Sequence, residues 1–144
     1  MTQILILEQR PERIAEFRRL LEPKYTLVFV DSVMKAMQAA KLGRFVLFIS
    51  ALHLVDDYSD DSIFDFLRAV KADPRISSVP FFLCCIGPSP LTLSMADALK
   101  ITARALGADY FELVSADALS AMPALVMRAV ETGKKRGKGN FQGR

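Results

Sequence analysis

The sequence has few of the residues that build disulfide frameworks or metal clusters. Its only two cysteines, Cys84 and Cys85, are adjacent, and neighbouring cysteines seldom bridge, so no disulfide framework is expected. The single histidine, His53, excludes a His-rich metal site. No apolar run reaches the roughly 18–20 residues that a membrane span needs. These absences favour a single-domain cytoplasmic protein with no membrane span and without a metal or other cofactor.

Positive charge is concentrated at the C-terminal end. The 144 residues are 51% hydrophobic and 24% charged, which is enough to build a full core. The net charge is +3, but five of the 19 basic side chains and none of the 16 acidic ones follow Glu131. The other 14 basic side chains leave residues 1–133 with a net charge of −2. We therefore expect a folded domain over residues 1–131 and a basic flexible tail or linker over residues 132–144, through which alone nucleic acid could be bound.

Short apolar segments alternate with longer amphipathic ones. The apolar segments predict strands over residues 3–7, 25–30, 45–49, 79–85 and 110–114. The amphipathic segments predict helices over residues 11–21, 33–41, 63–72, 92–106 and from about 115 to 131, with Pro123 kinking or dividing the last one. Nearly continuous apolar strands are typical of a parallel sheet covered on both faces. The pattern predicts a doubly wound α/β fold.

Several short motifs, in their order and spacing, resemble the CheY-like receiver domain of bacterial response regulators. The resemblance covers residues 3 to about 131, and it is carried by residues 4–7, 50–54, 65–75, 79–80 and 107–111. It implies a flavodoxin-like, five-stranded parallel sheet of (βα)5 type with strand order 2-1-3-4-5. It also implies a module of two-component signal transduction rather than an enzyme, with a kinase, an output domain or a second copy as its protein partner.

The family's phosphoryl-transfer chemistry can be carried over position by position. Receivers accept a phosphoryl group on an aspartate, hold Mg²⁺ with an acidic pair, and use a hydroxyl and a lysine beside the phosphoryl oxygens. The corresponding positions are Glu8 and Gln9 for the acidic pair, Ser50 for the acceptor, Cys85 for the hydroxyl, Val114 for the lysine and Phe111 for the switch aromatic. Four of the five phosphorylation positions lack the required group. The resemblance therefore implies a pseudo-receiver that keeps the fold and has lost phosphorylation.

Two other functions remain open. A small-molecule or anion-binding α/β domain could use the remodelled pocket, with Arg10 and Arg44 as anion contacts. A conventional receiver with a displaced acceptor would use Asp56 or Asp57, in the acidic segment 55–62.

Cys84 and Cys85 are expected to pack in the core rather than to sense redox state, because no positive charge lies near them in the sequence.

A partner surface is expected on the last two helices and the last strand, as in receivers. Its candidate residues are Ala98, Ile101, Ala105, Phe111, Leu119 and Met122.

Overall fold

A computed structural model describes residues 2–52 and 62–142, with side chains described as far as Arg136. Its strands are β1 (Gln3–Leu7), β2 (Thr26–Val30), β3 (Leu47–Ala51), β4 (Phe81–Ile86) and β5 (Tyr110–Val114). Its helices are α1 (Pro11–Leu21), α2 (Val33–Leu42), α3 (Asp65–Ala72), α4 (Pro90–Ser94), α5 (Ala96–Ala105), the short 3₁₀ helix η1 (Ala116–Ala121) and α6 (Met122–Gln142).

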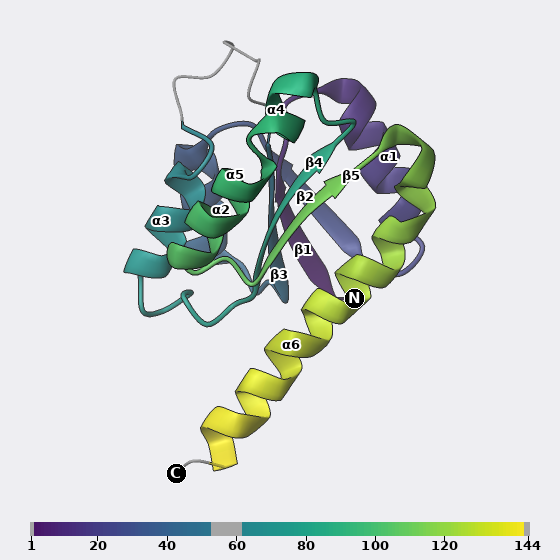
Figure 1. The fold of residues 1–144 in the computed structure, drawn as a ribbon. Coiled ribbons are helices and arrows are strands. Elements are labelled where there is room, and N and C mark those ends of the chain that lie inside the picture. Colours follow the sequence, from purple (N-terminus) through teal and green to yellow (C-terminus); the bar gives the residue numbers. More distant parts are fainter. Residues whose placement is uncertain (1, 53–61, 143–144) are drawn as a thin grey trace.

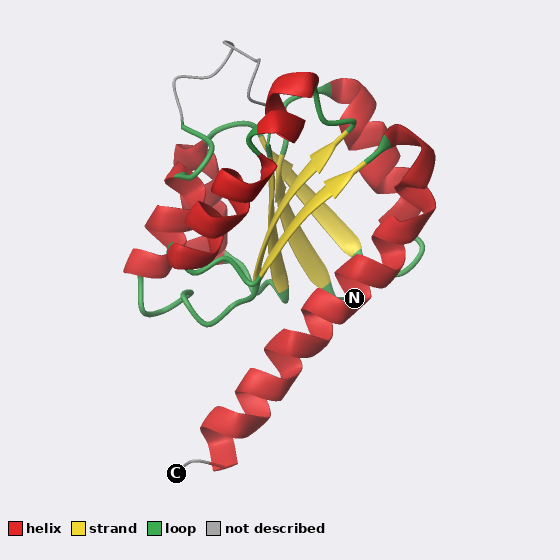
Figure 2. Cartoon of the chain, in the orientation of Figure 1, coloured by secondary structure: helices red, strands yellow, loops and turns green. Residues whose placement is uncertain are grey.

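The five strands form one parallel sheet in the order β2-β1-β3-β4-β5, as predicted. Helices lie on both faces of the sheet (Figures 1 and 2). All strands end at the same edge, which we call the carboxyl edge, and begin at the opposite, amino edge. Within the described ranges, no helix is long and apolar enough to cross a membrane.

Alternating side chains of the strands build two cores. Ile4 and Ile6 pack on the face covered by α1 and α6, whereas Leu5 packs on the face covered by α2, α3 and α5 (Figure 1). Every residue of β4 is buried, and all six are apolar or cysteine. This two-sided burial explains why the strands read as continuous apolar segments rather than as alternating ones.

Several element boundaries differ from the prediction by one or two residues, β4 and α3 among them, and two differences affect the site. β3 begins at Leu47 instead of residue 45 and ends at Ala51, so Ser50 lies inside the strand. Apolarity alone could not place this boundary, because Phe45 and Val46 are half-buried before the strand begins. The helix predicted over residues 92–106 is divided into α4 and α5 at Met95, whose backbone leaves the helical conformation (φ −102°, ψ 6°).

The C-terminal segment also differs from the prediction. α6 does not end near residue 131 but runs to Gln142, so residues 132–142 of the predicted tail are helical. The segment predicted as one helix from about residue 115 is divided just before Pro123: the 3₁₀ helix η1 ends at Ala121 and α6 begins at Met122. Pro123 lies in the first turn of α6, where proline is tolerated. The second half of α6 extends beyond the amino edge of the sheet (Figure 1).

Three charged residues hold this extension against the body, and we call Lys71, Asp109 and Arg136 the Asp109 cluster. The Asp109 carboxylate accepts a hydrogen bond from the backbone N–H of Phe81 (2.8 Å) and forms an ion pair with Arg136. Lys71 Nζ lies 3.8 Å from the same carboxylate. Gly133 allows the helix to come close, because an added Cβ would lie 2.8 Å from Pro80 Cδ. The extension is therefore tied to the loops before β4 and β5, which the sequence reading did not anticipate.

The Asp109–Arg136 pair is expected to stabilise the second half of α6. In a double-mutant cycle of D109N and R136Q, we expect a coupling energy of about 1–3 kcal/mol in the free energy of unfolding, because the Asp109 side chain is only 11% exposed. Urea unfolding measures it. R128Q, an exposed substitution in the same helix, is the control and should change stability by less than about 0.5 kcal/mol. Additive effects of D109N and R136Q would contradict the assignment.

Candidate functional site

The first two candidate residues follow β1 at the carboxyl edge. The Glu8 side chain is buried, and its Oε1 accepts hydrogen bonds from the backbone N–H groups of Gln9 and Arg10, both at 3.0 Å. These bonds turn the carboxylate toward the start of α1. Gln9 is exposed, and its Nε2 donates to the backbone oxygen of Asp31 at 2.9 Å. The two side chains therefore serve the β1–α1 and β2–α2 turns.

The acceptor position lies in the sheet beside an apolar cluster. Ser50 is 2% exposed and is paired in register with Leu7 and Leu83. Just beyond it, Leu52, Cys85 and Leu99 form a small core, and all three are buried. A serine hydroxyl in this setting has neither the charge nor the exposure of an acceptor carboxylate.

The lysine and aromatic positions are occupied by core side chains. Val114 is 4% exposed and packs in the core on the α1 and α6 face, while its backbone oxygen accepts from the N–H of Gly87 at 2.8 Å. Phe111 is half-buried and packs on the opposite face, between the large core and the Leu52–Cys85–Leu99 cluster. Phe111 has no hydroxyl, so its ring can act only through packing.

The described residues at this edge do not fit a Mg²⁺ ion. Mg²⁺ requires several hard oxygen ligands in near-octahedral array. Of the two acidic positions only Glu8 has a carboxylate, and one of its oxygens already accepts two backbone bonds. In the described ranges, no group of three or more His, Cys, Asp or Glu side chains could hold a metal ion.

Two arginines, Arg10 and Arg13, bring positive charge to the carboxyl edge, and the sequence reading did not anticipate Arg13. Burial raises the pKa of the Cys85 thiol, while Arg13 and Arg10 oppose this effect and Glu8 adds to it. Arg13 also forms an ion pair with Glu16 (2.6 Å). The Arg13 guanidinium lies beside Gly87, since a Cβ added to this glycine would be 3.0 Å from Arg13 Nη2. The sequence did contain a signal for the position of these arginines. Arg10 and Arg13 are three residues apart directly after a strand, and the turn that follows a strand lies at the carboxyl edge.

The expectation that Arg10 and Arg44 share an anion is wrong. Arg10 follows β1 and lies at the carboxyl edge, whereas Arg44 precedes β3 and lies at the amino edge. Because the strands are parallel and five residues long, the two arginines are separated by the length of a strand, about 15 Å.

A pocket of about 310 Å³ opens at the carboxyl edge beside β1 and β2. Its polar lining comes from Glu8, Gln9, Asp31 and Lys35, and its apolar lining from residues that include Ile14 and Phe29. Lys35 Nζ and the Asp31 carboxylate form an exposed ion pair across 3.0 Å. The lining therefore contains two carboxylates and one ammonium, which is a poor environment for an anion.

The partner-surface candidates separate into accessible and inaccessible residues. Ala98, Ile101 and Ala105 are exposed on α5, and the Ile101 side chain is 69% exposed. Phe111 and Leu119 are half-buried. Met122 is fully buried in the core, so its place in the predicted surface is wrong: α6 begins there and turns this side chain inward. The sequence reading missed Leu91, Leu93 and Met95, which are exposed on or just after α4.

The single histidine and the displaced-acceptor candidates lie outside the described residues. His53 and the aspartates at positions 56, 57, 60 and 61 belong to residues 53–61. The displaced-acceptor hypothesis, which concerns Asp56 and Asp57, therefore stays a prediction.

Comparison with solved structures identifies the architecture. A signal receiver domain of a LuxO repressor protein from Vibrio parahaemolyticus matches with a TM-score of 0.73 at 17% identity, covering 94% of this chain and 95% of that one. A sensor protein from Polaromonas sp. JS666 matches with a TM-score of 0.72 at 16% identity, covering 92% and 98%. The chemotaxis protein CheY4 of Vibrio cholerae matches with a TM-score of 0.71 at 18% identity, covering 90% and 98%.

These likenesses show that the chain has the fold of CheY-like receiver domains. The predicted flavodoxin-like sheet with strand order 2-1-3-4-5 is confirmed. No protein-family model matches the sequence, and no curated protein matches it.

Alkaline pH is expected to destabilise the protein through its two buried thiols. Burial raises the pKa of Cys84 and Cys85, so the folded protein keeps thiol protons that the unfolded chain releases above about pH 8.5. The stabilisation is complete below that pH and is lost as pH rises, by up to about 1.4 kcal/mol per pH unit for each thiol. Urea unfolding between pH 7 and 9.5 should show a steeper fall for the wild type than for the C84A/C85A double variant. Equal slopes would contradict this origin.

Proposed function

We propose that the chain is a receiver-like signalling module that works without aspartyl phosphorylation and acts by binding another protein. The fold is that of receivers, which in their two-component role receive a signal from a kinase and pass it to an output partner. In this chain, most of the positions that carry phosphoryl chemistry in a receiver hold residue types without the required charge or hydroxyl. Signalling would then depend on contact alone.

The observation that supports this proposal is the replacement of the phosphorylation site by core packing. Cys85 belongs to a buried apolar cluster, Val114 to the main core, and Ser50 to the interior of β3. Phosphoryl transfer to a carboxylate needs preorganised positive charge and a metal at the same point. Restoring these groups would require charged side chains where the chain now buries apolar ones, which costs several kcal/mol for each unpaired charge.

Incubation with acetyl phosphate and Mg²⁺ tests the loss of phosphorylation. We expect no phosphoryl adduct in intact-mass spectrometry, either for the wild type or for S50D. The S50D variant supplies a carboxylate but leaves Gln9 and Val114 in place, so the metal and the lysine are still missing. An active receiver domain under the same conditions is the positive control.

An adduct on the wild type would sink the proposal. If that adduct disappears in D56N or D57N, the chain is instead a conventional receiver with a displaced acceptor. An adduct on S50D alone would show that the remaining groups suffice for transfer, and that only the acceptor has been lost.

The proposed protein contact lies on the exposed apolar residues of α4 and α5. Leu91, Leu93 and Met95 are 40–56% exposed, and Ile101 on α5 is 69% exposed. Contiguous exposed apolar residues are typical of protein-binding surfaces. This surface adjoins β5 through Phe111, which packs against Leu99 of α5. A partner on α5 would therefore be coupled to the carboxyl edge through packed side chains.

I101E is expected to weaken partner binding, while M34E should not. Both side chains are 69% exposed, but Met34 lies on α2, away from the proposed surface. A charge placed in the centre of an apolar interface costs about 2 kcal/mol or more, and thus over tenfold in affinity. Self-association is measured by sedimentation equilibrium, and affinity for an identified partner by titration calorimetry. An equal loss in both variants would place the contact elsewhere.

A further inference from the structure

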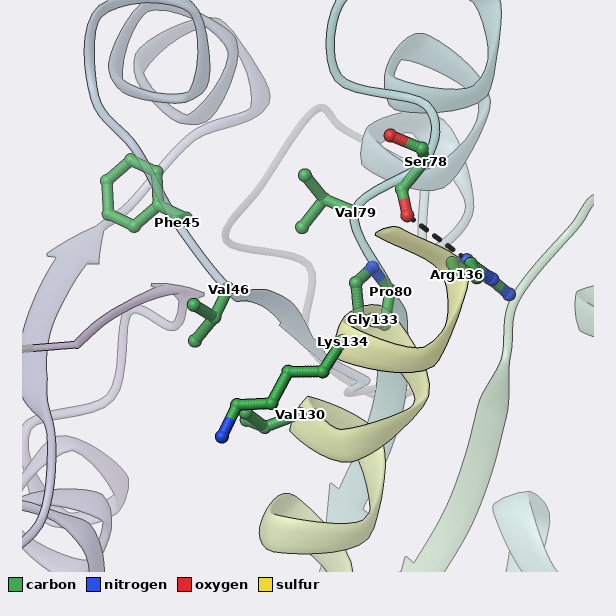
Figure 3. A pocket seen from close by; sticks show the side chains of 9 residues that line it. All are labelled: Phe45, Val46, Ser78, Val79, Pro80, Val130, Gly133, Lys134 and Arg136. Atoms are coloured by element: carbon green, nitrogen blue, oxygen red, sulfur yellow. Dashed lines mark hydrogen bonds between the residues drawn. The ribbon is translucent and has the colours of Figure 1, made fainter. Parts of the chain in front are cut away.

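A second pocket lies at the amino edge, at the opposite end of the sheet from the receiver-like site. It has a volume of about 250 Å³ and lies between α6 and the segments that lead into β3 and β4 (Figure 3). At about 30 Å³ per water in the liquid, this volume corresponds to about eight waters or a ligand of about ten non-hydrogen atoms.

The walls of this amino-edge pocket are mainly apolar. Val46, Val79 and Pro80 line the side of the sheet, and Val130 lines the side of α6 (Figure 3). A pocket with apolar walls and a few polar groups is the usual form of a small-molecule site. The pocket is therefore suited to an apolar group.

The two sides of the pocket are held in a fixed relation. Arg136 binds Asp109 and also donates to the backbone oxygen of Ser78 at 3.3 Å, so it bridges α6 to the segment before β4. One turn earlier in α6, the hydroxyl of Thr132 forms a 2.6 Å hydrogen bond with the hydroxyl of Tyr110. A preformed site loses less free energy to ordering when a ligand binds.

Positive charge exceeds negative charge around the pocket. Among the described residues, its lining contains Lys134 and Arg136 but no carboxylate. Arg136 is neutralised by Asp109, which Lys71 also approaches, so the Asp109 cluster carries one surplus positive charge. Burial and the charge of Arg136 both lower the pKa of Lys71, as expected where cations are in excess.

Lys134 is the cation that a ligand could use. Its Nζ is 3.3 Å from Glu131 Oε1, and both side chains are more than half exposed, so their ion pair is weak and can be exchanged for another carboxylate. Figure 3 shows the Lys134 side chain running along the rim of the pocket past Val130. Arg136 is less available, because its guanidinium already has two partners.

We propose that the amino-edge pocket binds a small organic carboxylate, with its apolar body between Val46, Val79 and Val130 and its carboxylate on Lys134. The proposal does not depend on the function proposed above, because the two sites lie at opposite edges of the sheet. A bound ligand would touch both α6 and the sheet, and would stabilise the second half of α6 against the body.

An NMR titration with 3-phenylpropionate tests the site, with the uncharged 3-phenylpropionamide as a matched probe of the same size. We expect saturable amide shifts at Val46, Val79 and Gly133, and at least fivefold weaker binding of the amide. K134Q should weaken binding of the carboxylate at least fivefold. K135Q, an exposed neighbour that does not line the pocket, should change it by less than twofold. The spectrum of each variant without ligand verifies that it is folded.

Three outcomes would overturn the proposal. The first is the absence of saturable shifts up to 20 mM probe, and the second is a set of shifts centred on Glu8 and Gln9 at the other edge. The third is any result in which the charge on Lys134 has no specific role. Such a result is either equal binding of the carboxylate and the amide or equal losses of affinity in K134Q and K135Q.

Discussion

The burial of both faces of the parallel sheet constrains everything else in this protein. Five apolar strands lie between α1 and α6 on one face and α2, α3 and α5 on the other. With both faces covered, polar chemistry is confined to the two edges where strands begin or end. Apolar side chains at the ends of the strands, such as Val114 and Cys85, belong to the cores and extend them to the edge.

The carboxyl edge illustrates this effect. Leu52, Cys85 and Leu99 extend the core up to the point where the strands end. The Glu8 carboxylate, which follows β1, accepts hydrogen bonds from backbone N–H groups at the start of α1. Arg10 and Arg13 bring positive charge beside Cys85, yet burial dominates and raises the pKa of the thiol. Core side chains thus fill the carboxyl edge beside β3, β4 and β5, while a pocket lies beside β1 and β2.

The amino edge owes its character to α6. The helix contains Gly133, Gly137 and Gly139, and each glycine costs about 1 kcal/mol in a helix interior. Contacts with the body offset part of this cost, through Thr132, Gly133 and Arg136. The extension of the helix, the pocket beneath it and the Asp109 cluster therefore belong to one arrangement.

The sequence by itself determined the fold class, because the periods of apolar residues and the turn residues between them are local properties. It located Glu8, Gln9, Ser50, Cys85 and Val114 in order along the chain, since each follows or belongs to a recognisable strand. It could not reveal that Arg13 lies near Cys85, that Arg44 lies at the other edge from Arg10, or that Met122 points into the core. It also did not reveal that the last helix continues to Gln142. Only the tertiary structure decided these points, because they depend on contacts between residues far apart in sequence, above all between Asp109 and Arg136.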